Sequence, residues 1–129
     1  MKTATLLSTA MVVGLLCSAC GSSDDPHCRM YLVADSSGSF LSLHVVDSPA
    51  RNSWGANLLN EPAEYLRDHP TWRVFRFAAG RTLDWKVDYK LGSVQRVADG
   101  EDNSCRDGKG LKLDIDGGYL FYTRFTFAH

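Results

Sequence analysis

The sequence predicts a mainly β fold, either an antiparallel β-sandwich or a small barrel of about seven strands with one short helix. Short segments rich in apolar, β-branched and aromatic residues recur along the chain, and clusters of turn-forming residues separate them. Strands do not alternate with helices, which disfavours a parallel α/β sheet. The charged residues within the strands are also unsuited to a membrane-spanning barrel.

The first two strands are expected to form a hairpin. Residues 30–34 are a continuous apolar run that ends at a cluster of turn residues, and residues 41–45 then alternate between apolar and polar. Pro49 ends the pairing because proline has no N–H to donate. A polar loop is therefore expected over residues 50–57.

One helix is predicted near residues 58–66. Asn60 can cap its start, Pro62 suits a first turn, and neighbouring glutamates favour the positive end of a helix. Pro70 stops it after about two turns.

The second half of the chain predicts further strands. Residues 71–78 are rich in β formers, and residues 83–89 alternate without exception between buried-type and charged side chains. A weak strand at 93–97 precedes the polar and acidic stretch 98–110, which we interpret as a loop.

The last hairpin allows two registers. A two-residue turn at 116–117 would place the aromatic residues of the final strand, 119–127, on the polar face. A three-residue loop at 116–118 pairs Leu113 with Phe121 and gathers the aromatics on the core side. We therefore expect the three-residue loop.

The first nineteen residues have the layout of an export signal. Lys2 precedes the apolar run 6–16, and the small residues Ser18 and Ala19 stand directly before Cys20. The run is shorter than the ~20 residues that cross a bilayer, so a retained transmembrane helix is the weaker alternative.

These residues resemble a bacterial lipoprotein signal, in which the cysteine becomes the lipidated first residue of the mature chain. Cys17 also lies in this stretch, but it follows bulky leucines, which favours Cys20 as the lipidation site. The resemblance implies a multiply acylated Cys20 (palmitate-type chains), and several acyl chains anchor a protein stably to a membrane. It also implies a location at the outer membrane, facing the periplasm, because no Asp follows Cys20 directly.

Removal of residues 1–19 leaves a lipidated cysteine and flexible tether at 20–27 and a single periplasmic domain at 28–129. Export places Cys28 and Cys105 in an oxidising compartment, which predicts a disulfide between them. A metal site that uses Cys28 is the alternative, but the paired spacing of zinc ligands is absent from the sequence. We expect no metal and no cofactor.

The formal net charge of −1 gives no reason to expect a nucleic-acid partner. The basic and acidic residues of neighbouring segments are interpreted as solvated faces, with a docking surface for a charged protein as the alternative. Residues 99–110 begin like a calcium loop, but Ser104 and Gly110 occupy positions where that loop needs Gly and Glu.

Trp54, flanked by Arg51 and Asn52, is the candidate partner-binding residue, because Trp and Arg are enriched at binding hot spots. The alternative is that Trp54 folds back and caps one end of the sandwich.

The sequence predicts a non-catalytic envelope protein that binds another protein, of the immunity, inhibitor or secretion-accessory type. The alternative is a carrier of a small apolar ligand, with a cavity among four aromatic residues: Trp72, Trp85, Tyr89 and Phe121. A hydrolase ranks third, since none of the four histidines stands in a recognisable catalytic motif.

Overall fold

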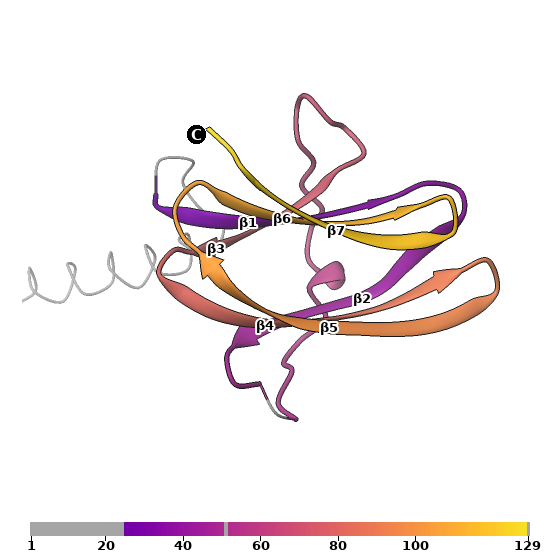
Figure 1. The fold of residues 1–129 in the computed structure, drawn as a ribbon, viewed down its shortest axis with the longest axis horizontal. Helices are drawn as coiled ribbons and strands as arrows, with labels where there is room; N and C mark the ends of the chain where they lie inside the picture. The colour runs from indigo at the N-terminus through magenta and orange to yellow at the C-terminus, as the bar shows by residue number, and fades with distance from the viewer. Residues whose placement is uncertain (1–24, 51, 129) are drawn as a thin grey trace, which may run out of the picture.

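The computed structural model describes residues 25–50 and 52–128 (Figure 1). Their structure confirms the predicted mainly β fold class. The strands are β1 (His27–Ala34), β2 (Gly38–Asp47), β3 (Arg73–Ala78), β4 (Arg81–Leu91), β5 (Val94–Cys105), β6 (Lys109–Asp116) and β7 (Tyr119–Thr126), with the 3₁₀ turn η1 (Leu58–Asn60) between β2 and β3.

The strands form two layers, a four-stranded sheet in the order β3-β1-β6-β7 and a three-stranded sheet in the order β2-β4-β5 (Figure 1). The sheets do not close on each other, so the barrel alternative is not supported. β1 and β6 run parallel, which corrects the expectation of wholly antiparallel pairing. The expected hairpin of β1 and β2 is also wrong. β1 lies between β3 and β6, and the chain crosses to the other sheet before β2 begins.

Hydrogen bonds tie the turn after β1 to the turn after β6. Asp35 accepts from the hydroxyl of Ser37, from the backbone N–H of Gly117 at 2.9 Å and from the backbone N–H of Ser37 at 2.8 Å. Because these bonds favour the carboxylate, with the Ser37 hydroxyl foremost, they lower the pKa of Asp35 to about 2. The neighbouring carboxyl of Asp35 raises the pKa of Asp116.

The apolar core fills the space between the sheets. Leu83 and Val87 of β4 are fully buried, and Trp85 and Tyr89 nearly so, which confirms the alternation predicted for this strand. Gly100 of β5 lies against the indole of Trp85, where a Cβ atom would come within 2.7 Å of the ring. The four-stranded sheet contributes Met30, Leu32, Leu111, Leu113 and Ile115.

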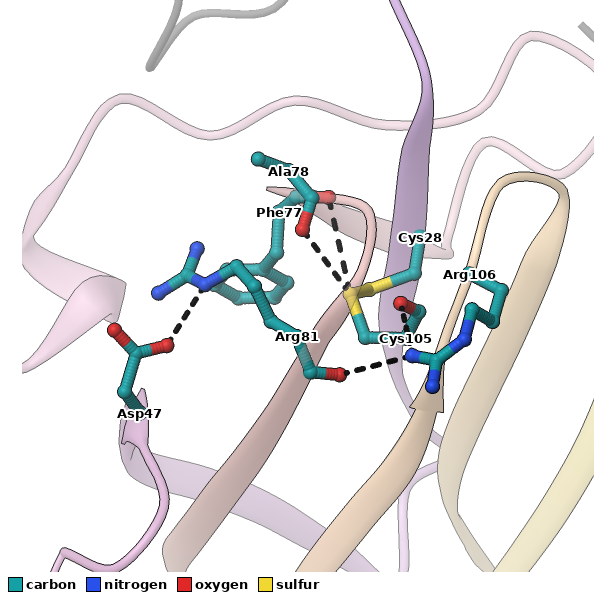
Figure 2. Close-up of polar contacts among 7 residues, drawn as sticks. All are labelled: Cys28, Asp47, Phe77, Ala78, Arg81, Cys105 and Arg106. Atoms are coloured by element: carbon teal, nitrogen blue, oxygen red, sulfur yellow. Dashed lines mark hydrogen bonds and ion pairs between the residues drawn. A yellow bond between two sulfur atoms is a disulfide. The ribbon is translucent and has the colours of Figure 1, made fainter.

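The predicted disulfide between Cys28 and Cys105 is present (Figure 2). It joins β1 to the end of β5, with both cysteines buried and their Cα atoms 5.0 Å apart. Arg106 donates to the carbonyl oxygens of Cys105 at 3.1 Å and of Arg81 at 3.4 Å, beside the bridge (Figure 2). The bridge therefore links one sheet directly to the other.

The predicted helix near residues 58–66 is not formed. Asn57, rather than Asn60, caps the short η1 turn, and its side chain accepts from the backbone N–H of Leu59 at 3.0 Å. Glu61 is extended (φ −80°, ψ 160°), because a residue before proline is disfavoured in the helical region. The chain then runs beside β3 instead of continuing as a helix.

Two boundaries differ from the expectations. β5 extends to Cys105 and so includes much of the acidic stretch that we interpreted as a loop. An acidic segment can form this strand because β5 is at the edge of its sheet, where polar side chains remain in water. His27, expected at the end of the tether, is the first residue of β1 and is only 4% exposed.

The three-residue loop predicted for the last hairpin is wrong. Gly117 and Gly118 form a two-residue turn with φ of 59° and 84°, values that glycine adopts without strain. Asp116 therefore pairs with Tyr119, and Leu113 pairs with Tyr122 rather than with Phe121. This register turns Phe121 to the outer face of the sheet.

Candidate functional site

One side of the sandwich is closed by the segment between β2 and β3, residues 48–72. At the edge of β2, the side chain of Asn57 accepts from the backbone N–H of Leu43 at 3.0 Å. At the edge of β3, the backbone N–H of Val74 donates to the carbonyl oxygen of Glu64 at 2.9 Å. Both edge strands on this side therefore have partners.

The other side, formed by β5 and β7, is open. Within residues 25–50 and 52–128, no strand or loop pairs with the outer edge of either strand. The two-residue turn makes Asp116 and Tyr119 a hydrogen-bonded pair. Along an antiparallel hairpin, hydrogen-bonded pairs alternate with pairs whose backbone groups point away from the partner strand. The backbone N–H and C=O groups of Leu120, Tyr122 and Arg124 consequently point away from β6. This row of groups is a template for a further strand.

β7 combines this open edge with exposed aromatic side chains. Tyr119 is 68% exposed, Phe121 50% and Tyr122 55%. Proline, lysine or a bulge often protects an edge strand, and β7 has neither residue and pairs with β6 in an unbroken register. Its one charged side chain, Arg124, is on the inner face and is paired with Asp102. On β5, Val94 and Val97 are also exposed. We call β7 together with β5 the open side.

Contacts across the seam between the sheets hold the open side in shape. Asp102 of β5 is 4% exposed, and its carboxylate accepts from Arg124 of β7 at 2.8 Å and from the backbone N–H of Ser104 at 2.9 Å. Trp85 and Tyr122 meet edge to face, with ring centroids 5.5 Å apart. The surface is therefore pre-organised, which reduces the entropy lost on binding.

The electrostatics of the seam affect Tyr122. Its partial burial raises the pKa of the phenol, and the nearby Tyr89 and Asp99 raise it further. The hydroxyl of Tyr122 thus keeps its proton, and its ability to donate a hydrogen bond, into more alkaline solution than an ordinary tyrosine.

Trp54 and Asn52, two of the three residues predicted to bind a partner, lie outside the open side. Trp54 is half-buried on the outer face of the three-stranded sheet, where the ammonium of Lys86 is 5.8 Å from its ring centroid. Asn52 beside it is exposed. Arg51 and the predicted lipidation site Cys20 are outside the described residues. The open side thus includes none of the residues predicted to bind a partner protein.

The cavity predicted for a carrier is not formed. Trp85 and Tyr89 lie in the core, Trp72 packs on the outer face of the four-stranded sheet, and Phe121 is exposed. His44, one of the four histidines, has its Nδ1 atom 3.1 Å from two carbonyl oxygens of the loop after β2, those of Gly55 and Ala56.

Within residues 25–50 and 52–128, no group of three or more His, Cys, Asp or Glu side chains is placed to bind a metal. No helix among these residues is long and apolar enough to span a membrane.

Comparison of the chain with models of protein families, with curated proteins and with solved structures found no match.

Proposed function

We propose that this chain is a lipid-anchored, non-catalytic protein of the bacterial cell envelope that binds another protein through its open side. In this proposal an acylated Cys20 holds the domain at the outer membrane, facing the periplasm, and residues 20–27 are its tether. An immunity protein, an inhibitor of a cell-wall hydrolase and an accessory subunit of a secretion apparatus are the types of function that fit.

The unpaired edge of β7, with its exposed aromatic side chains, is the observation that carries this proposal. A partner that supplies an extended segment can add a strand there, since main-chain hydrogen bonds give affinity and flanking side chains give specificity. Tyr119, Phe121 and Tyr122 are large aromatic groups, the kind that dominates binding energy at protein interfaces. The closed side offers no comparable edge, because residues 48–72 cover it.

The test compares aromatic residues of equal exposure on the two sides. The double variant Phe121→Ser/Tyr122→Ser removes two side chains of β7, and Tyr65→Ser removes a tyrosine that is 53% exposed in the covering segment. A partner is first captured from solubilised envelopes of the source organism and purified, and its affinity for each folded variant is then measured by calorimetry.

We expect the double variant to bind at least about tenfold more weakly than the wild type, and Tyr65→Ser to bind as the wild type does. The proposed surface would be contradicted if the double variant bound the partner as tightly as the wild type does, or if Tyr65→Ser lost as much affinity as the double variant. The anchor is tested separately by Cys20→Ser, which should release the protein from the membrane fraction. Retention of that variant would contradict lipidation at Cys20.

A further inference from the structure

A hollow of about 520 Å³ lies on the outer face of the four-stranded sheet. It is bordered by β1, by the end of β7 and by the segment that leads into β3. Its volume is within the range of about 300–1,000 Å³ that is usual for small-molecule sites. The lining residues that carry the inference are Arg29, Tyr31, Trp72, Phe125 and Phe127.

Arg29 is fixed in this hollow by contacts that leave part of its guanidinium unused. Its Nε donates to Nε2 of His27 at 3.1 Å, and its Nη1 donates to the hydroxyl of Tyr31 at 3.2 Å. The guanidinium carbon lies 3.9 Å from the ring centroid of Phe127. None of the described carboxylates forms an ion pair with Arg29.

These contacts use Nε and one hydrogen of Nη1, so the other hydrogen of Nη1 and both hydrogens of Nη2 remain for a ligand. That fork matches the two oxygens of a carboxylate, which arginine commonly binds through two parallel hydrogen bonds. Since the side chain is already held in place, binding would cost little of its conformational entropy.

Aromatic side chains that pack on one another form much of the wall of the hollow. Phe125 stacks on Tyr31 with centroids 5.1 Å apart, and Trp72 meets Tyr31 edge to face at 5.7 Å. His69 stacks on the indole of Trp72 at 4.0 Å, and the ammonium of Lys112 lies 4.4 Å from the same ring centroid. The hollow therefore offers apolar surface for the body of a ligand beside the guanidinium of Arg29 for its charged end, and Arg67 and Asp68 also line it.

We infer that this hollow binds a small organic carboxylate with an aromatic or other apolar body. The carboxylate pairs with Arg29, and the apolar body lies against Phe125 and Phe127. This site is separate from strand addition at β7 and does not depend on the proposed function.

The experiment uses 4-phenylbutyrate as the probe and 4-phenyl-1-butanol as its uncharged match, each titrated into isotope-labelled protein and followed by backbone amide shifts. Arg29→Gln removes the cation. Arg29→Lys keeps the charge without the fork and serves if the first variant fails to fold. Arg96→Gln, in an exposed position on β5, is the matched control.

We expect the acid to shift amides around the hollow in a saturable way, with affinity reduced about tenfold or more in Arg29→Gln and unchanged in Arg96→Gln. The alcohol should bind the wild type no better than the acid binds Arg29→Gln. Absence of saturable binding, equal binding of acid and alcohol, an unaffected Arg29→Gln variant, or shifts that map elsewhere would each overturn the inference.

Discussion

Replacement of Cys28 and Cys105 by alanine is expected to lower the free energy of unfolding by about 4.5 kcal/mol. The bridge closes a loop across 77 residues of sequence, and the chain-entropy relation gives about 4.5 kcal/mol for that length. Because small domains are stable by only about 5–15 kcal/mol, the variant should lie close to the threshold of unfolding. Both cysteines are buried between the sheets, so substitution also removes packing contacts.

Urea denaturation followed by circular dichroism measures this loss, in oxidised and reduced wild-type protein and in the double alanine variant. Reduction should destabilise the wild type about as much as the double substitution does, and reductant should leave the variant unchanged. A loss below about 1 kcal/mol would refute the argument that closure of this loop is a large part of the stability.

Three further predictions concern packing and titration. Leu113→Ala should lower the unfolding free energy by about 2–5 kcal/mol in the same assay, because Leu113 is fully buried and its truncation leaves a cavity; a loss under about 1 kcal/mol would contradict this placement. Gly100→Ala should cost about 1–3 kcal/mol and alter the near-ultraviolet dichroism of Trp85, since the added Cβ would come within 2.7 Å of the indole; an unchanged spectrum and stability would contradict that contact. The pKa of Asp35 is lowered to about 2, so the stability from its carboxylate is present above the ordinary pKa and is lost as pH falls towards 2. Acid denaturation of Asp35→Asn should lack this part of the decline, and identical acid profiles would count against the turn contacts. The raised pKa of Asp116 has the opposite effect on the wild type: ionisation of Asp116 destabilises the folded protein, and this loss of stability is relieved as pH falls.

The features that could be predicted from sequence depend on local patterns. Strict alternation over residues 83–89 identified the inner face of β4. This strand lies between two others, with one face in the core and the other in water, so apolar and polar side chains must alternate along it. Two cysteines in a domain expected to be exported were enough to predict the bridge between Cys28 and Cys105. In both cases the local pattern leaves few alternative structures.

The failures arise where tertiary context decides. Near Asn60 and Pro62, helix-start signals were outweighed by pairing of the chain with the edge of β3. The parallel pairing of β1 with β6 joins strands far apart in sequence, and no local signal reports it.

The open side was missed because aromatic residues were assigned to the core. Gly117 and Gly118 together are a signal for a two-residue turn, and this turn places Phe121 outside. The edge position of β7, which leaves even Tyr122 on the inner face more than half exposed, depends on the strand order of the whole sheet.

Amide hydrogen exchange along β7, with and without the purified partner, tests the central claim most directly. In the free protein the amides of Leu120, Tyr122 and Arg124 should exchange fast and those of Phe121 and Thr123 slowly, since only the latter face β6. Added partner should protect the first three amides and so remove the alternation. Uniform protection in the free protein, or protection by the partner only outside β5 and β7, would contradict the account.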